Sequence, residues 1–553
     1  MTSPRKTLFA AACSTFARAA IPLAAVACAL TVQPAAAAVS SDWTGTATHA
    51  FDAHGLTAKG SLSSSATVSI VVSLKLNNQD ELKSFISATH KAGSPAFGAR
   101  LSSDTVVSRY SPTVAQAKAV TDYLKANGFT NIVVDSNRLL VSADGTPATI
   151  RAAFNTELKQ YSVDGRLAFA NSSPAQVPSR LSGIVNAVVG LDTVSQFHTM
   201  LQKADVSPNA SGGFIPTAFP KAYGVGTMTT AAHSLVAITS WGNLDSAVTD
   251  LRSFESKYSL PQVPVTMTYV PSKPTLTYGY TAEWDLDSQD IQGMTGGLAG
   301  IYGYSSKNNG SSNLLSTLNK VVTDNFVANI DDSWGGCESS NYSSGFMASA
   351  DAIFQTATAQ GQTFFFSTGD SGSNECGTGS PTVSYPSSSP WVVAVGGTSL
   401  YVDGSGNYSS ESVWSGEGGG ISAYETAQSW QTEYLSHGTK RSVPDIVMDA
   451  DPNTGAIIVV SGKNSQYGGT SLAAPLATAV WARYNSILGV TGFAAPSLYY
   501  ILDFGTLPSV PYHDVTTGNN GAFSAGTGWD TATGLGSFDI SNWYNDLVWL
   551  YGG

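Results

Sequence analysis

The chain carries little charge for its length. Asp, Glu, Lys and Arg together make up 12% of its 553 residues, and 39 acidic against 27 basic side chains give a formal net charge of -12. Nucleic-acid binding requires clustered basic side chains, commonly interleaved with aromatic residues, and no segment has that composition. We therefore expect no nucleic-acid partner. The low charge density, together with abundant Gly, Ser and Thr, favours a secreted protein.

Long hydrophobic runs are also missing after the N-terminal segment. No later stretch reaches the roughly 18 uninterrupted apolar residues of a membrane-spanning helix. At the N-terminus, Arg5 and Lys6 precede an apolar region that ends in small residues at 34–38. This order is typical of a secretory signal peptide, so residues 1–38 are predicted to be removed on export. A membrane anchor and lipidation of Cys28 are the weaker alternatives.

Cysteine is scarce. Removal of the signal peptide would also remove Cys13 and Cys28, which leaves Cys337 and Cys376 as the only cysteines of the mature chain. In an oxidising compartment these two can form one disulfide, and two free buried thiols are the alternative. Two cysteines without matching histidines make a poor zinc site.

The residues that follow the signal peptide divide into two units. From about 65 to 175 the order β-α-β-β-α predicts a small α+β unit of ferredoxin-like type. Its expected elements lie at 68–74, 111–127, 132–134, 139–141 and 149–155.

Residues 202–216 have the Pro, Gly, Asn and Ser content of a linker. Beyond them, apolar runs at 235–239, 363–367 and 391–395 alternate with helical patterns, which is typical of buried strands in a mainly parallel sheet. The sequence therefore predicts an N-terminal unit with its linker at 39–206 and an α/β domain at 207–553.

A glycine-rich loop leads to Ser471 at the start of a predicted helix. A serine hydroxyl becomes a nucleophile when a neighbouring base takes its proton, and the N-terminus of a helix favours developing negative charge. Gly468 and Gly469 would let a substrate backbone approach closely. The alternative is an ordinary loop capped by its own hydroxyl groups.

An acidic segment supplies a candidate base. On a helix, Glu283 and Asp287 lie one turn apart on one face, with about 5–6 Å between Cβ atoms. Like charges so close resist double ionisation and share a proton, which suits acid or base chemistry. Asp290 lies near the same face, whereas Asp285 points away. The alternative is a solvated acidic helix face.

A run of three phenylalanines precedes Asp370. Strand ends are where α/β sheets present functional groups, and a carboxylic acid kept protonated by an apolar site can donate a hydrogen bond to an oxyanion. A turn residue is the alternative.

Together, Glu283, Asp287, Asp370 and Ser471, in this order, resemble the sedolisin family of serine-carboxyl peptidases. The resemblance extends to 333–338, 385–390, 443–446 and 450–455, and residues 100–192 resemble the prodomain of these enzymes. It implies a subtilisin-like catalytic domain. In that fold Ser471 would be the nucleophile, Glu283 the general base and acid, Asp287 its orienting partner and Asp370 the oxyanion stabiliser.

The same resemblance implies a secreted, acid-active endopeptidase that acts on proteins or peptides as a monomer. Its prodomain would be an intramolecular inhibitor, released by cleavage near 202–213. The C-terminal segment resembles the calcium loop of the family. One Ca²⁺ would be held by the carboxylates of Asp514 and Asp530, by water, and by the carbonyl groups of Val515, Gly526 and Gly528. A loop without metal is the alternative.

Three rival functions stay open. A tripeptidyl-peptidase of the same fold would remove tripeptides instead of cutting internally. A secreted binding protein could retain the peptidase fold without activity. A histidine-based triad would need His437, but the residues that follow His437 have little tendency to form a helix.

Overall fold

The structure is a computed structural model that describes residues 42–53, 55–91, 93–204, 212–275, 281–435, 438–502 and 509–551. The predicted signal peptide, residues 205–211 of the linker and His437 lie outside the described residues. Within the described ranges, no helix combines the length and the apolar character needed to cross a bilayer.

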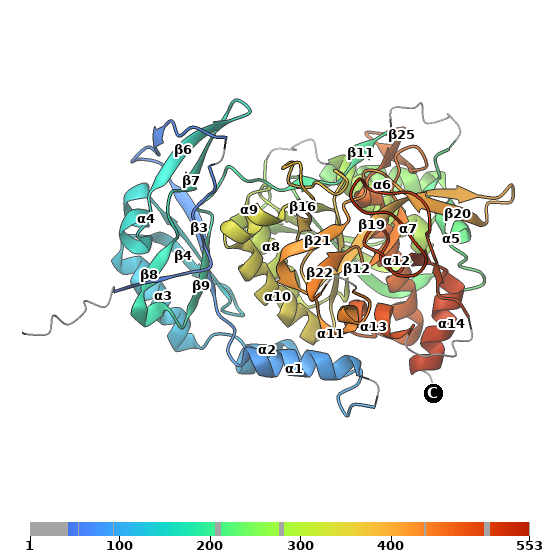
Figure 1. The fold of residues 1–553 in the computed structure, drawn as a ribbon, viewed down its shortest axis with the longest axis horizontal. Helices are drawn as coiled ribbons and strands as arrows, with labels where there is room; N and C mark the ends of the chain where they lie inside the picture. The colour runs from blue at the N-terminus through green and yellow to red at the C-terminus, as the bar shows by residue number, and fades with distance from the viewer. Residues whose placement is uncertain are drawn as a thin grey trace, which may run out of the picture. The chain divides into compact units, whose positions relative to one another are not determined.

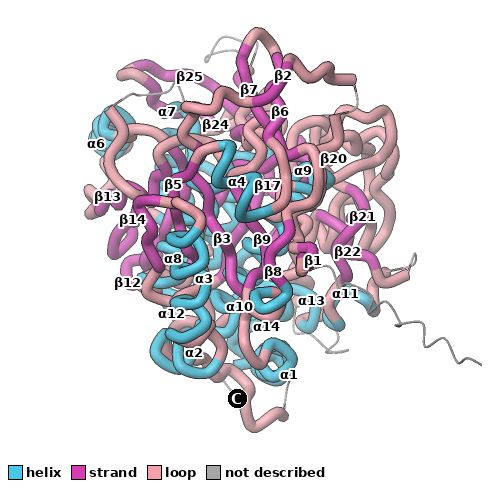
Figure 2. The backbone as a smooth tube through the Cα atoms, turned by 90° about the vertical axis from the view of Figure 1, so that its left-hand side faces the viewer, coloured by secondary structure: helices cyan, strands magenta, loops and turns pink. Residues whose placement is uncertain are grey.

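Four antiparallel strands form the sheet of the N-terminal unit, in the order β4-β5-β3-β9. Their bounds are β3 (Val68–Leu74), β4 (Thr130–Val134), β5 (Leu140–Gly145) and β9 (Val185–Val189). Figure 2 shows helices α3 (Val114–Ala126) and α4 (Pro147–Phe154) in front of this sheet. The βαββαβ order with antiparallel neighbours is the predicted ferredoxin-like arrangement.

Several elements of this unit were not predicted. Helix α1 (Gln79–His90) begins after Asn78, which has a left-handed backbone and no side-chain cap, so the usual start signal is missing. Helix α2 (Ser103–Arg109) is only two turns long, and β6 (Leu158–Val163) with β7 (Arg166–Asn171) adds a hairpin. The short elements are β1 (Trp43–Gly45), β2 (Gly60–Ser61), β8 (Gln176–Pro178) and η1 (Ser179–Leu181).

Both faces of β3 are buried, which explains its nearly continuous apolar run. Val68, Ile70 and Val72 point to one side and join the core beneath α3 and α4. Val71 points to the other side and joins the core of the C-terminal domain, because side chains alternate along a strand. The hydroxyl groups of Ser73 and Ser349 share a hydrogen bond of 2.7 Å at this contact.

The C-terminal domain is built on an eight-stranded sheet in the order β13-β14-β12-β15-β17-β19-β20, with β23 also pairing β19. All neighbours are parallel except β19 and β20. The strands are β12 (Ala231–Trp241), β13 (Val265–Val270), β14 (Leu298–Ser306), β15 (Asn329–Asp332), β17 (Thr363–Ser367), β19 (Val393–Val402), β20 (Tyr408–Val413) and β23 (Ile446–Asp449). The three predicted strands therefore belong to β12, β17 and β19, which confirms a mainly parallel sheet.

Helices α7 (Thr281–Thr295) and α12 (Thr470–Leu488) pack against each other and against this sheet (Figure 1). The other helices are α5 (Phe219–Ala222), α6 (Asp245–Lys257), α8 (Ser311–Asp324), α9 (Glu338–Ser343), α10 (Phe346–Gln360), α11 (Ser429–Thr432), α13 (Ala494–Tyr500), α14 (Ile540–Tyr551) and the 3-10 turn η2 (Pro216–Ala218). Short strands outside the main sheet are β10 (His198–Thr199), β11 (Gln202–Lys203), β16 (Trp334–Cys337), β18 (Ser384–Tyr385), β21 (Gly420–Thr426), β22 (Lys440–Val443), β24 (Ala456–Val460), β25 (Lys463–Gly468), β26 (Tyr512–His513) and β27 (Ser537–Phe538).

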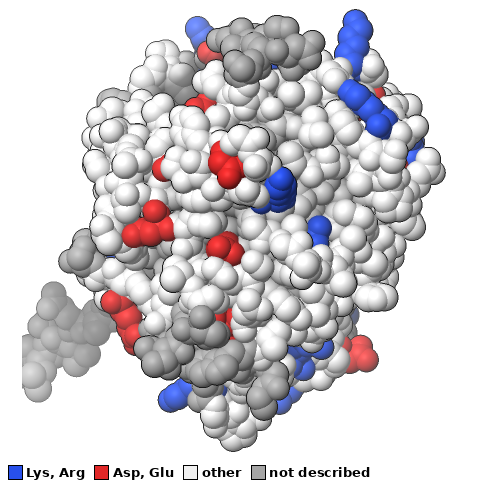
Figure 3. Space-filling model, turned by 90° about the vertical axis from the view of Figure 1, so that its right-hand side faces the viewer, with Lys and Arg blue, Asp and Glu red and all other residues white. Residues whose placement is uncertain are grey.

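Charged side chains are sparse on the face shown in Figure 3, where they stand as scattered groups on a largely uncharged surface. This agrees with the low charge content of the sequence.

Candidate active site

Ser471 is the second residue of α12 and is fully buried. Gly469, just before the helix, has a φ of +92°, a backbone conformation that favours glycine. A Cβ atom at Gly469 would lie 2.1 Å from the carbonyl oxygen of Met200, and one at Gly468 would lie 2.4 Å from that of Ala450. The two glycines thus leave room for other backbone segments beside Ser471.

A peptide carbonyl group is seated at the start of α12. The N–H of Ser471 donates to the carbonyl oxygen of Met200 at 3.1 Å, and the N–H of Met200 donates to the carbonyl oxygen of Ser333 at 3.2 Å. The hydroxyl of Ser471 donates to the same Ser333 oxygen at 3.3 Å. No residue pattern in the sequence marks Met200 as part of the site. Its only signal was its position two residues before the predicted linker.

Helix α7 places Glu283 and Asp287 beside α12. The helix is buried on every side from Glu283 to its end. The alternative of a solvated acidic helix face is therefore wrong. Burial, followed by the negative charge of Asp287, raises the pKa of Glu283 well above its usual value. The neighbouring hydroxyl groups of Ser471 and Thr199 act in the opposite direction. Asp285 has a different neighbour: burial and then Asp250 of α6 raise its pKa to about 9.

Asp287 belongs to a larger group of buried carboxyl groups than the sequence predicted. Burial and then Asp331 raise the pKa of Asp287, and Asp290 and Asp332 act in the same direction. The hydroxyl of Ser333 partly offsets them. Asp331 and Asp332 end strand β15, immediately before Ser333. They stand at a strand end, immediately before the family-like segment 333–338, and this position could have marked them in the sequence.

Asp370 lies three residues after β17, on the loop that faces the start of α12. Its Oδ1 accepts hydrogen bonds from the N–H of Thr470 at 2.8 Å and from the hydroxyl of Thr470 at 2.9 Å. Its Oδ2 is buried, and no partner for it lies among the described residues. Burial raises the pKa of Asp370 to about 7, although the bonds from Thr470 lower it in part.

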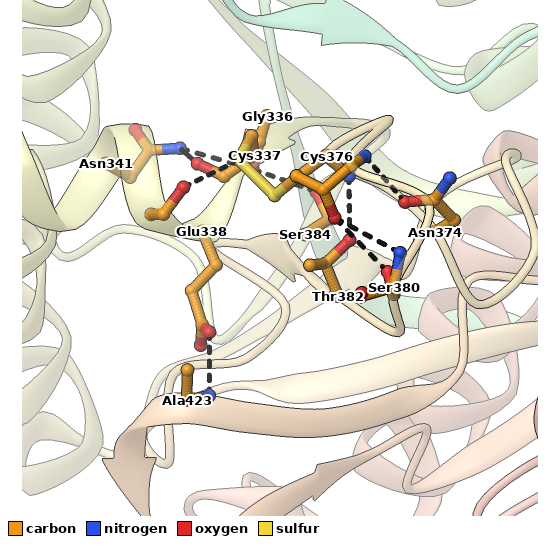
Figure 4. The surroundings of a disulfide bond; sticks show 12 residues. Gly336, Cys337, Glu338, Asn341, Asn374, Cys376, Ser380, Thr382, Ser384 and Ala423 are labelled. Carbon is orange, nitrogen blue, oxygen red and sulfur yellow. Dashed lines mark hydrogen bonds between the residues drawn. A yellow bond between two sulfur atoms is a disulfide. The ribbon is translucent and has the colours of Figure 1, made fainter. Parts of the chain in front are cut away.

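The disulfide between Cys337 and Cys376 is formed, which confirms the predicted pairing (Figure 4). It joins β16 to the loop that follows Asp370. Glu338, the next residue, accepts a hydrogen bond from the N–H of Ala423 at 3.0 Å, and the N–H of Cys376 donates to the hydroxyl of Thr382 at 2.9 Å. The bridge therefore anchors the Asp370 loop to the strand that contacts residues 198 and 199.

The predicted calcium residues come together in one C-terminal loop. Asp514 Oδ2 accepts from the N–H of Gly528 at 3.0 Å, and Asp530 Oδ2 accepts from the N–H of Gly526 at 2.8 Å. Val515 is buried next to Asp514. No group of three or more His, Cys, Asp or Glu side chains that could hold a metal ion lies in the described part of the chain. A shell of two carboxylates, carbonyl groups and water needs no such cluster, so these residues fit a calcium ion.

Comparison with known proteins covers both units. The family model of the pro-kumamolisin activation domain matches residues 54–194, and the model of the subtilase family matches residues 286–488. Sedolisin from Pseudomonas sp. (strain 101) is 40% identical over 514 residues, which covers 87% of each chain. Xanthomonalisin from Xanthomonas sp. (strain T-22) is 40% identical over 551 residues, covering 88% of this chain and 66% of that protein.

Among solved structures, Pseudomonas sedolisin complexed with two molecules of pseudo-iodotyrostatin matches with a TM-score of 0.59 at 38% identity. The match covers 62% of this chain and all of that chain. With these matches over most of its length, the chain belongs to the sedolisin family: it is a serine-carboxyl peptidase that carries an N-terminal activation domain.

Proposed function

We propose that the protein is a secreted, acid-active endopeptidase that removes its own prodomain. Ser471 is the nucleophile, Glu283 the general base and acid, Asp287 its orienting partner and Asp370 the oxyanion stabiliser. One observation supports this most directly: the carbonyl oxygen of Met200 accepts the N–H of Ser471, next to the unpaired Oδ2 of Asp370. A peptide group in that position is arranged as a substrate of a serine peptidase would be.

In the first half of the reaction, Glu283 takes the proton of Ser471 as the hydroxyl oxygen attacks the peptide carbonyl carbon. The oxyanion that forms accepts hydrogen bonds from the N–H of Ser471 and from protonated Asp370 Oδ2. Both donors are buried, so they need little reorganisation as the charge develops. Glu283 then returns the proton to the leaving amine, and an acyl-enzyme remains.

In the second half, water replaces the amine. Glu283 takes a proton from the attacking water, the same two donors stabilise the second oxyanion, and the proton returns to Ser471 as the acid product leaves. Asp287 shares a proton with Glu283 and the neighbouring acids, which holds the Glu283 carboxyl in place.

Two opposite requirements bound the pH range of activity. Glu283 must lose a proton to act as a base, whereas Asp370 must keep its proton to donate a hydrogen bond. With a pKa of about 7, Asp370 is protonated below neutrality and loses its donor function as the pH rises through that value.

Endopeptidase action is supported by the path of the chain on both sides of Met200. Strand β10 pairs with β16 before Met200, and β11 pairs with β25 after it. The backbone thus continues in both directions, as an internally cut substrate requires. A tripeptidyl-peptidase instead needs a substrate that ends three residues before the cut.

With these roles, the chain divides into an export signal, a prodomain and a peptidase domain. Residues 1–38 are the export signal, 39–206 the prodomain with its linker, and 207–553 the peptidase domain, which works as a monomer on proteins or peptides. Asp514, Asp530 and the carbonyl groups of Val515, Gly526 and Gly528 would hold one Ca²⁺, whose charge would neutralise the two carboxylates and keep the C-terminal loop closed.

The experiment is to express wild type, Ser471→Ala and Glu283→Gln, and to follow processing and peptide cleavage from acid to alkaline pH. Both variants should accumulate the full-length precursor and lose at least about 10⁴-fold in activity. Ser410→Ala and Glu433→Gln, which change exposed residues of the same types, should process normally. Normal processing of Ser471→Ala would favour the binding-protein alternative, and loss of proteolysis in His437→Ala would favour a histidine triad.

A further inference from the structure

We infer that the precursor first cuts itself between Met200 and Leu201, and that the mature enzyme selects peptides with an unbranched apolar side chain at the Met200 position and an aromatic side chain three residues earlier. This inference rests on the proposed function. It moves the self-processing bond to just before residues 202–213, where the sequence alone predicted it.

The backbone of residues 198–204 lies along the active site as an extended strand. His198 and Thr199 pair with Gly335 and Trp334 of β16, and the N–H of Met200 continues the ladder to Ser333. After Leu201, Gln202 and Lys203 pair with Gly468 and Tyr467 of β25. The N–H of Ala204 donates to Gln466 at 3.1 Å. Antiparallel pairing on both sides fixes which peptide group meets Ser471.

Among the described residues, the carbonyl of Met200 stands at the reacting position. A Cβ atom on Gly469 would lie 2.1 Å from this oxygen and 2.6 Å from Asp370 Oδ2, so the two oxygens converge on the same point. The side chains on either side also touch the site. The neighbouring polar side chain of Thr199 lowers the pKa of Glu283, and that of Gln202 lowers the pKa of Asp370.

The side chain of Met200 is 1% exposed and lies over Gly335. A Cβ atom at Gly335 would be 2.8 Å from Met200 Cε and 2.4 Å from the hydroxyl oxygen of Ser384. The glycine therefore makes room for a long, unbranched side chain. An acidic side chain there would be desolvated without a cationic partner, which is unfavourable.

Phe197 is the second buried anchor, at 4% exposed. Its ring packs edge-on against Trp334 with 5.1 Å between centroids, and against Phe346 at 4.7 Å. Its carbonyl oxygen accepts from Asn309 at 2.8 Å. His198, between the anchors, is exposed. Burial along this segment thus assigns recognition to Phe197 and Met200, while the exposed position of His198 tolerates many side chains.

The reaction balances with water as the only co-reactant. The Ser471 oxygen bonds to the Met200 carbonyl carbon, the bond to the Leu201 nitrogen breaks, and the serine proton reaches that nitrogen through Glu283. Water then hydrolyses the ester, which leaves a carboxyl group on Met200 and a free amine on Leu201.

The first test follows the purified precursor after acidification, by intact mass and N-terminal sequencing over time. The earliest new N-terminus should be Leu201. Met200→Asp and Phe197→Ala should each slow this cut at least tenfold. Leu167→Asp, at a position 67% exposed in the prodomain, should keep the wild-type rate. A first cut at another bond, or a wild-type rate in Met200→Asp, would overturn the inference.

The second test uses mature enzyme and synthetic peptides, so it does not depend on the folding of precursor variants. A peptide with the sequence of residues 196–203 should be cut after Met. Replacing Met by Asp or Phe by Ala should lower kcat/KM at least tenfold, within the roughly 10–200-fold range of apolar pockets. Replacing His by Ala should change it little. Equal cleavage of all peptides would refute the recognition. In that case the proposed function would still hold if wild-type enzyme digests a denatured protein and the Ser471→Ala variant does not.

Discussion

Thr470 holds the carboxyl group of Asp370 by two hydrogen bonds to one oxygen, from its N–H at 2.8 Å and from its hydroxyl at 2.9 Å. The hydroxyl also accepts a bond from the N–H of Gly369 at 3.1 Å. Because Oδ1 is occupied in this way, Oδ2 is the oxygen left to face the carbonyl of Met200. The residue before the nucleophile thus orients the second oxyanion donor.

Replacing Thr470 by Val keeps the shape and removes the hydroxyl. Asp370 should then lose its orientation, and kcat should fall by up to about 100-fold, as expected for a misplaced catalytic group. Thr470 lowers the pKa of Asp370, so its loss should also move the alkaline limb of the pH profile to higher pH. Thr470→Ser should behave like wild type. If kcat falls but the alkaline limb of the pH profile stays at the same pH, Thr470 has only a structural role.

The fall of kcat at alkaline pH should reflect the deprotonation of Asp370. Its pKa is raised to about 7, so the donating form is lost as the pH rises through neutrality and kcat should fall there. Asp370→Asn keeps an N–H donor at every pH, so it should retain part of the activity and lose that limb. Asp370→Ala should cost about 10²–10³-fold in kcat. If the fall of kcat at alkaline pH persists in Asp370→Asn, the group that titrates there is not Asp370.

Stability should decrease from acid to alkaline pH. Burial raises the pKa of Asp290, Asp331 and Asp332, so the folded state binds protons more tightly than the unfolded state. Their contribution is complete below the unfolded pKa of about 4 and is lost as the pH rises through the folded values. The Tm of the Ser471→Ala precursor, which cannot digest itself, should therefore drop between about pH 4 and pH 8.

The same measurement on variants identifies the groups responsible. Asp290→Asn should reduce the difference in Tm between the two pH values, because the amide does not titrate. Asp122→Asn, at an exposed position of α3, should leave it unchanged. A Tm that rises toward alkaline pH would contradict the assignment.

Calcium should stabilise the mature enzyme. At a free concentration 100 times Kd, a single site adds about 2.7 kcal/mol, which appears as a higher Tm that a chelator reverses. Asp514→Asn and Asp530→Asn should each abolish this shift and the heat of calcium binding in calorimetry. Glu433→Gln, an exposed acidic position, serves as the matched control. A calcium effect that survives both Asp variants would place the ion elsewhere.

Loss of the disulfide should affect both stability and catalysis. The bridge closes a separation of 39 residues, so the Cys337→Ser, Cys376→Ser double variant should lose about 2–4 kcal/mol in free energy of unfolding. kcat should also fall, because the Asp370 loop loses its anchor on β16. A reductant should lower the Tm of wild type but not that of the variant. Equal responses would show that the bridge is dispensable.

The element types were predictable where local signals agree. β17 and the middle of β12 are continuous apolar runs, and α3 and α4 begin with capping side chains, so pattern and propensity pointed to the same answer. α1 lacks a capping side chain and α2 is short, so their stability depends on packing that sequence does not display. The Val-rich β3 could be recognised as a strand, but not as one buried on two faces.

The sequence alone determined the residue types of the site, because Glu283 and Asp287 at helical spacing, Asp370 at a strand end and Ser471 at a helix start follow from local pattern and family resemblance. Only the tertiary structure decided what surrounds them. It buried α7 on all sides and added Asp331 and Asp332 to the acid cluster. It also laid residues 198–204 across Ser471. These features depend on contacts between segments far apart in the chain, and the energetics of a buried carboxyl group depend on such neighbours more than on its own sequence.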